Sequence, residues 1–134
     1  MFSLIEEKAL LGPHVKAVFT ESEGAELTEQ LRQYMERERP FLDAELTLEQ
    51  LANRLAMKPK VLSQLINFSL QQNFFDFVNR YRIAEAKRLL LNKTDKKMTI
   101  LEVLYKVGFN SKSSFNTLFK KYTGLTPSEF KKQP

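Results

Sequence analysis

The fold is decided by residues 99–122, which read TILEVLYKVGFNSKSSFNTLFKKY. Residues 99–102 have the spacing of a helix-capping box, in which a threonine hydroxyl accepts a hydrogen bond from the backbone N–H three residues later. Gly108 ends this first helix, and Asn110 or Ser111 begins a second helix that runs to the end of the stretch. The sequence therefore predicts two short helices joined by a tight turn.

The same pattern occurs earlier in the chain, where Thr47 and Gln50 give another capping-box spacing. The first helices of the two pairs match at an offset of 52 residues and the second helices at 53, so the pairs differ by one residue in the turn. The earlier helices are predicted at 48–56 and 59–69, with Pro59 in the first turn of the latter. The repeat predicts two helix-turn-helix units.

The rest of the sequence is also helical in pattern. Only 4 glycines and 5 prolines interrupt 134 residues, and apolar residues recur at helical spacing. We expect a helix that stops before Pro40, a long linker helix at 74–91 and a short helix after Thr126. The predicted fold class is all-α, with about seven helices that form two helix-turn-helix subdomains joined by the linker helix.

Weaker patterning at the N-terminus sets the expected domain boundary. Residues 1–25, with Gly12-Pro13 and Gly24, are interpreted as a lead-in segment or the cut end of a longer protein. Residues 26–134 are interpreted as one domain, with its two units at about 47–70 and 99–123.

Positive charge is concentrated at the C-terminal end. The net charge is +5, but residues 1–43 hold 5 basic and 9 acidic side chains, whereas residues 80–134 hold 13 basic and 4 acidic ones. Residues 44–79 hold 3 of each. This distribution favours a polyanionic partner that the C-terminal half binds more strongly.

Composition excludes several classes of function. With no cysteine, neither a disulfide framework nor a thiolate metal site is possible, and His14, the one histidine, cannot build a metal cage. No apolar run approaches the roughly 18 residues of a membrane span. No Gly-rich phosphate loop occurs, and no nucleophile has a histidine base. We therefore expect a cytoplasmic protein that is not an enzyme, uses no cofactor and makes no membrane contact.

The second helix of each pair has an apolar and a polar face. The apolar positions correspond at the 53-residue offset and are expected to form the core: Leu62, Leu65 and Ile66 with Phe115, Leu118 and Phe119. The opposite, polar positions are Lys60, Ser63, Gln64 and Asn67 in the first unit and Ser113, Asn116, Thr117 and Lys120 in the second. Short donors and acceptors on an outward-held helix suit the hydrogen-bond patterns of the DNA major groove.

Two other interpretations of these features stay open. The polar faces can be plain solvated surface, or they can dock a partner in a helical protein–protein interaction module without DNA specificity. Phenylalanines can also stack on bases, as in single-strand binders, but helical spacing favours the core for them. This applies to Phe74, Phe75, Phe77, Phe109, Phe115, Phe119 and Phe130.

Four separated segments resemble, in the right order, the double helix-turn-helix domain of AraC/XylS-type bacterial regulators. They are residues 48–52 (LEQLA), 81–90 (YRIAEAKRLL), 107–121 (VGFNSKSSFNTLFKK) and 124–130 (GLTPSEF). The resemblance covers about residues 42–131. It implies a sequence-specific DNA-binding domain of a transcription regulator, which inserts recognition helices at 59–69 and 111–122 into adjacent major grooves of double-stranded promoter DNA.

Residue roles follow from the same resemblance. It implies base-reading or groove-facing positions at Lys60, Ser63, Gln64 and Asn67 in the first unit and at Ser113, Ser114 and Thr117 in the second. Phosphate contacts are implied at Asn116, Lys120 and Lys121, and Lys112 belongs to the same candidate DNA-binding set. The resemblance further implies RNA polymerase or a sensor domain as partners in a full-length protein.

Three departures from the family pattern affect these expectations. Leu104 stands where alanine is usual, and Gln71 where glycine commonly follows the first recognition helix. Residues 66–67 (IN) stand where many members have an aromatic residue followed by lysine. The first unit is therefore expected to lack a phosphate contact and to contribute less to the affinity.

Overall fold

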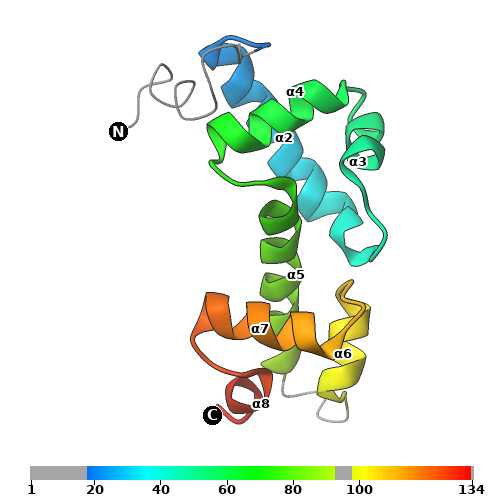
Figure 1. The fold of residues 1–134 in the computed structure, drawn as a ribbon, viewed down its shortest axis with the longest axis vertical. Helices are drawn as coiled ribbons and strands as arrows, with labels where there is room; N and C mark the ends of the chain where they lie inside the picture. Colours follow the sequence, from blue (N-terminus) through cyan, green and yellow to red (C-terminus); the bar gives the residue numbers. More distant parts are fainter. Residues whose placement is uncertain (1–17, 93–97, 134) are drawn as a thin grey trace. The chain divides into compact units, whose positions relative to one another are not determined.

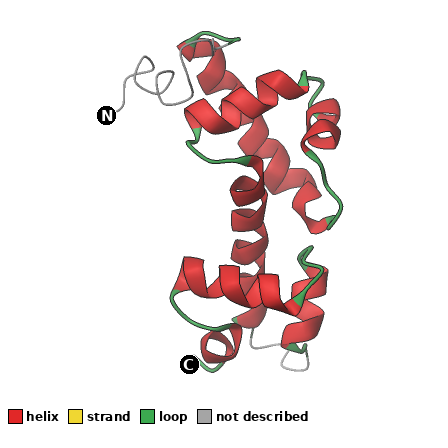
Figure 2. Ribbon diagram, viewed as in Figure 1, coloured by secondary structure: helices red, strands yellow, loops and turns green. Residues whose placement is uncertain are grey.

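The computed structural model describes residues 18–92 and 98–133, and these form seven α-helices without a strand (Figures 1 and 2). The helix number and the all-α class predicted from the sequence are confirmed. No helix in the described ranges is both long and apolar enough to cross a membrane. The helices are α2 (Glu21–Glu38), α3 (Leu48–Arg54), α4 (Pro59–Gln64), α5 (Phe74–Leu90), α6 (Ile100–Lys106), α7 (Lys112–Thr123) and α8 (Pro127–Lys131).

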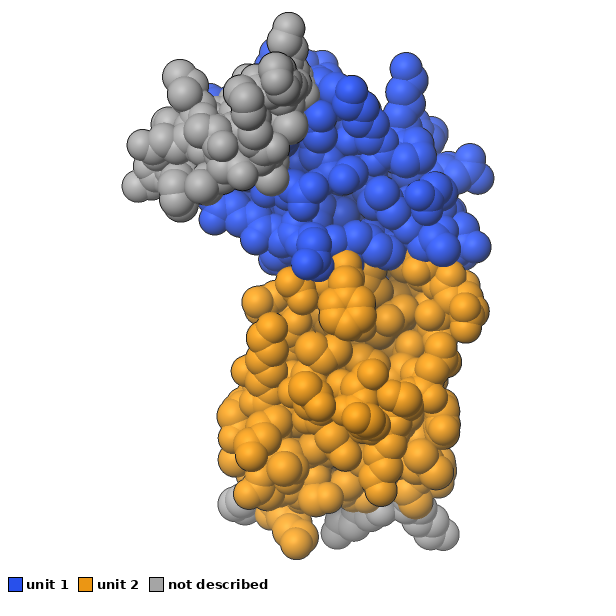
Figure 3. Space-filling model, viewed as in Figure 1, with its two compact units in different colours: residues 1–39, 47–74 blue, residues 40–46, 75–134 orange. Residues whose placement is uncertain are grey.

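The chain divides into two compact units, each with one predicted helix pair (Figure 3). Unit 1 comprises the chain up to Arg39 together with Thr47–Phe74, and thus holds α2, α3 and α4. Unit 2 comprises Pro40–Leu46 and the chain from Phe75 onward, and holds α6, α7, α8 and nearly all of α5. The 3-10 turn η1 (Pro40–Leu42) therefore belongs to unit 2, although it directly follows α2 in the chain.

Helix α2 begins earlier than the sequence pattern indicates. Its N-cap is Thr20, whose hydroxyl accepts from the Glu23 N–H while the Glu23 carboxylate accepts from the Thr20 N–H. Gly24, assigned to the lead-in segment, therefore lies inside a helix, and that part of the interpretation is wrong. Hydrogen bonds to the Glu23 carboxylate, from the backbone and then from the side chain of Thr20, lower the pKa of Glu23 from its ordinary value.

The core of unit 1 forms where α2 packs against the end of the first recognition helix. That helix runs as α4 and then continues as a π-helical segment, η2 (Leu65–Ser69), which together match the predicted range of 59–69. The capping box of Thr47 and Gln50 starts α3 as expected. The fully buried side chains of this unit include Leu31, Met35, Leu51, Leu62, Leu65 and Ile66.

The core of unit 2 contains a row of aromatic rings, each in contact with the next. Phe109 lies 5.2 Å from Phe115, Phe115 5.5 Å from Phe119, and Phe119 5.3 Å from Phe130, measured between ring centroids. Edge-to-face and tilted contacts at such distances add to the free energy of burial. The predicted core face of α7 is confirmed, because Phe115 and Phe119 are fully buried and Leu118 nearly so.

Two phenylalanines depart from the predicted core assignment. Phe75 is 60% exposed, and Phe74 beside it is half-buried. Both lie in the first turn of α5, ahead of Phe77 and Val78, which are the first buried residues of that helix. Leu104, which stands where the resembling family usually has alanine, is fully buried and is thus accommodated in the core.

Side-chain caps start the helices of unit 2. Ser111 caps α7, with its hydroxyl accepting from the Ser114 N–H at 3.1 Å. Thr126 and Glu129 form a complete capping box at α8. At α6 the Thr99 hydroxyl accepts from the Glu102 N–H, but it also donates to the Glu102 carboxylate at 3.2 Å, so this box differs from the reciprocal form predicted.

Arg82, in the middle of α5, holds the chain around η1 within unit 2. Its Nε donates to the Phe41 carbonyl at 2.7 Å, and its two terminal nitrogens donate to the Asp43 carbonyl at 2.9 Å and to Asn79 Oδ1 at 3.0 Å. Burial lowers the pKa of Arg82, with the Asp43 charge opposing the shift, yet a guanidinium stays protonated at neutral pH. Arg82 therefore acts as a charged clamp.

The turns that flank the second helix of each pair have positive φ at equivalent positions. Gly108 and Gly124 in unit 2 have φ values of 103° and 82°. At offsets of 52 and 53 residues, the equivalent positions in unit 1 are Ala56 and Gln71, with φ of 55° and 53°. A side chain in this left-handed region costs roughly 1–2 kcal/mol, so unit 1 bears a penalty that unit 2 avoids.

The substitution Ala56→Gly should stabilise the protein by about 0.5 to 1 kcal/mol, since glycine removes the left-handed penalty but adds chain entropy to the unfolded state. Gly108→Ala should instead cost more than about 3 kcal/mol, because its Cβ would also lie 2.5 Å from the Phe41 carbonyl oxygen. Urea denaturation measures both changes. Gly124→Ala, with nothing within 4 Å of its Cβ, is the control for the φ penalty alone.

Replacing Arg82 with methionine should destabilise the protein by about 2 to 4 kcal/mol, because two backbone carbonyls and an amide oxygen lose their donors. Arg82→Lys should recover only part of the loss, since one ammonium cannot span three acceptors. Arg88→Met on the same helix is the matched control, because Arg88 is largely exposed and its ion pair among the described residues is with Glu85. Equal shifts of the urea midpoint in the Arg82 and Arg88 variants would contradict the clamp.

Candidate nucleic-acid interface

The polar face of α7 is the most open of the predicted contact surfaces. Burial of Phe115, Leu118 and Phe119 fixes the rotation of the helix about its axis, so the opposite positions point away from the core. Six of the seven predicted side chains are exposed, and Asn116 is half-buried. The exposed ones are Lys112, Ser113, Ser114, Thr117, Lys120 and Lys121.

Chemically, this face combines short hydroxyl groups with lysines. Within the described part of the chain, neither the Ser113 nor the Thr117 hydroxyl takes part in a hydrogen bond, and the α7 lysines form no ion pair with a carboxylate. Lys121 lies with its Nζ 5.7 Å from the Tyr122 ring centroid, a cation–π contact that leaves its charge at the surface. The face can therefore donate to and accept from a polar partner, and it attracts anions.

The first recognition helix presents a smaller polar surface than predicted. Lys60 is exposed, whereas Ser63 and Asn67 are half-buried and lie near each other, with Asn67 Nδ2 3.5 Å from Ser63 Oγ. Lys60 is the one basic side chain between residues 59 and 69. Within this helix the predicted contact set thus reduces to one open lysine and two partly covered side chains.

Gln64 does not lie on the exposed face, so its predicted placement there is wrong. Only 9% of its surface is exposed, and its Oε1 accepts a hydrogen bond from the Val18 N–H at 3.0 Å. The equivalent residue of unit 2, Thr117, is exposed. The difference arises because the chain just before α2 lies against α4, a contact between residues 46 positions apart that helical periodicity cannot reveal.

Signals of other chemistries are weak in the part of the chain that the structure covers. No group of three or more His, Asp or Glu side chains in it lies close enough together to hold a metal ion.

The structural role of Arg82 has no signal in the sequence pattern, although Arg82 lies in the 81–90 segment that resembles the family. The hydrogen bond from Arg82 to the Phe41 carbonyl spans 41 residues.

Comparison with known proteins agrees with this architecture. A family described as a helix-turn-helix domain matches residues 51–133. The chain is 32% identical over 91 residues to an uncharacterized HTH-type transcriptional regulator, YtdP, of Bacillus subtilis, covering 68% of this chain and 11% of that protein. It is 35% identical over 89 residues to the arabinose operon regulatory protein of Escherichia coli, covering 66% of this chain and 30% of that protein.

Solved structures show the same fold. The C-terminal domain of AraT, a response regulator from Geobacillus stearothermophilus, superposes with a TM-score of 0.65 at 30% identity, over 78% of this chain and 83% of that one. The C-terminal domain of the two-component response regulator yesN from Fusobacterium nucleatum gives 0.66 at 27% identity, over 80% and 99%. The chain spans less than a third of the length of YtdP and of the arabinose operon regulatory protein. It belongs to the AraC/XylS-type helix-turn-helix family of DNA-binding transcription regulators.

Proposed function

We propose that this chain reads a specific sequence of double-stranded promoter DNA by inserting α7 into one major groove and the α4–η2 helix into another. The observation that carries the proposal is the polar face of α7, where free hydroxyl groups are flanked by lysines that form no ion pair among the described residues. Hydroxyls can donate to or accept from base edges, and lysines neutralise phosphates.

Roles divide along α7 according to side-chain reach. Ser113, Ser114 and Thr117 lie in its first half and are the proposed base-reading residues, because a recognition helix contacts bases through its N-terminal part. Lys120 and Lys121 lie in its last turn and are proposed to bind phosphates. Two further phosphate contacts are proposed for Lys112 at the first turn and for Asn116, whose amide is half-buried.

The first unit is proposed to add a weaker contact through Lys60, Ser63 and Asn67. Gln64 is left out of this set, because its side chain is buried and hydrogen-bonded to the Val18 backbone. Together the units would cover about 20 base pairs, with successive major grooves about 34 Å apart. The site should be asymmetric, with most of the affinity under α7.

RNA polymerase and a sensor module are proposed partners of a longer regulator that contains this domain. The support is indirect: similar structures are C-terminal domains of response regulators, and the relatives include an operon regulatory protein. The inducing signal would then act outside this domain.

The variants Thr117→Ala and Lys120→Ala should have different effects on DNA binding. Thr117→Ala should lose about 1 to 3 kcal/mol on the preferred duplex and relax the preference at one base pair. Lys120→Ala should weaken binding to all sequences alike and lower the salt slope by about one. Titrations against a duplex selected from a random library and against an unrelated duplex measure both, and identical behaviour of the two variants would show the role assignment to be wrong.

For the unaltered protein, a plot of log affinity against log salt should have a slope of about −4 to −7, because some five to eight phosphates are neutralised at about −0.9 each. A flat plot, with binding to a protein partner that survives high salt, would instead favour a protein-interaction module.

In the same DNA-binding assay, the double variant Lys60→Ala with Asn67→Ala should cost less affinity than the double variant Thr117→Ala with Lys120→Ala. Equal losses from the two pairs would contradict the asymmetric site.

A further inference from the structure

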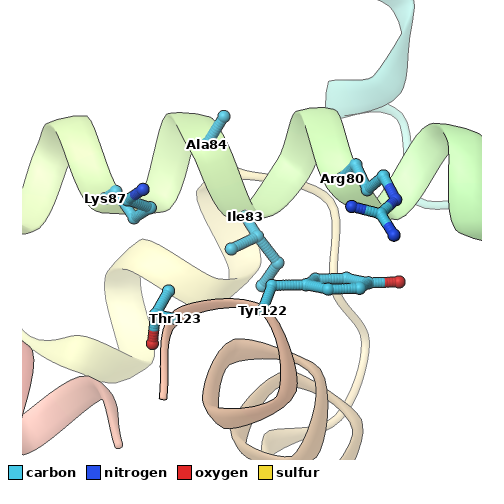
Figure 4. A pocket seen from close by; sticks show the side chains of 6 residues that line it. All are labelled: Arg80, Ile83, Ala84, Lys87, Tyr122 and Thr123. Carbon is cyan, nitrogen blue, oxygen red and sulfur yellow. The ribbon is translucent and has the colours of Figure 1, made fainter. Parts of the chain in front are cut away.

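A small pocket opens between α5 and the end of α7, within unit 2 (Figure 4). Its volume is about 120 Å³, room for several water molecules or for one tetrahedral oxyanion. Ile83 of α5 points toward Tyr122 of α7, and Ala84 and Thr123 also line the pocket. None of the contact residues predicted from the sequence lines it.

Two cations of α5 stand on the rim of this pocket. Arg80 and Lys87 are seven residues apart, so they lie on the same face of the helix, about 10.5 Å apart along its axis. The Arg80 guanidinium lies 4.7 Å from the centroid of the Tyr122 ring, and Figure 4 shows it reaching across the pocket toward α7. Lys87 has no ion pair or hydrogen bond with any described side chain.

Other groups around the pocket leave its positive charge in excess. Lys121 contacts the same Tyr122 ring at 5.7 Å, so a third cation adjoins the pocket. The nearby carboxylate, Asp76, lies 3.4 Å from the Tyr122 hydroxyl. Burial, and then the Asp76 charge, raise the pKa of Tyr122, so the phenol is neutral at physiological pH and does not offset the cations.

We propose that this pocket binds a phosphate oxyanion supplied by the DNA backbone beside the groove that α7 reads. An oxyanion between Arg80 and Lys87 would accept charge-assisted hydrogen bonds from both, beside the buried side chain of Ile83. Lys121 links the pocket to the phosphate-binding end of α7, which makes the backbone of the same duplex the nearest source of phosphate. This inference rests on the proposed function and extends the DNA contact from α7 to α5.

The experiment uses the full chain and the variants Arg80→Gln, Lys87→Gln and their combination, titrated with the selected duplex and an unrelated duplex at several salt concentrations. Each single variant should weaken binding to both duplexes by the same factor. The double variant should make the salt slope less steep by about 0.9 for each phosphate that it no longer neutralises. Arg80→Lys should retain the slope, because it keeps the charge.

The matched control is Arg88→Gln, which removes the same charge from the same helix at a side chain paired with Glu85. It should leave the salt slope close to that of the unaltered protein. Unchanged thermal midpoints would show that the variants are folded. If Arg88→Gln alters the slope as much as Arg80→Gln does, the effect is long-range electrostatics, and the pocket assignment is wrong.

A second arm separates the two sources of phosphate. Inorganic phosphate is titrated against the DNA-free protein, with the NMR shift of the Arg80 side-chain Nε–H as the readout. Saturable phosphate binding together with an unchanged DNA salt slope in the double variant would assign the pocket to a small free anion and overturn the DNA assignment. If the unaltered protein itself shows no salt-dependent DNA binding, the proposed function fails, which is a different outcome from a failure of the pocket alone.

Discussion

Burial of one face of α7 is the constraint on which the proposed DNA-binding surface depends. Phe115 and Phe119 are fully buried in the row of aromatic rings of unit 2, and this fixes how α7 is rotated about its axis. With that rotation fixed, Thr117 must point outward. The caps at Ser111 and Gly124 then fix where the helix starts and ends. Packing of the apolar face of α7 therefore determines which side chains are exposed on its polar face, and no further contact is needed to orient them.

Unit 1 follows the same plan but meets different surroundings. The chain before α2 lies against its recognition helix, so Gln64 is hydrogen-bonded to Val18 where unit 2 leaves Thr117 open. The backbone of unit 1 also places non-glycine residues in conformations that favour glycine. The three non-glycine residues with positive φ among the described residues, Arg39, Ala56 and Gln71, all belong to unit 1. The asymmetry therefore extends from charge to accessibility and backbone strain.

Much of this fold is predictable because its signals are local. Threonine hydroxyls three residues before an acidic or amide side chain mark helix starts, and the core faces of both recognition helices follow from periodicity. Thr20 and Glu23 carry the same local signal at α2, although weak apolar patterning nearby obscures it. Two further departures are non-local: the buried Gln64 and the Arg82 clamp depend on partners 46 and 41 residues away.

The distribution of charge explains why a regulator of this kind can tolerate an unequal pair of units. Phosphate contacts supply affinity without sequence information, so they need not be shared evenly between two recognition helices. Residues 80–134 carry 13 basic side chains against 4 acidic ones, whereas residues 44–79 are balanced. Under the proposed function, unit 2 would thus hold the duplex while unit 1, with fewer open side chains, would add discrimination at a second groove. In the proposed division, a loss of charge in unit 2 would weaken binding to all sequences, whereas a change in the α4–η2 helix would alter which sequences are bound.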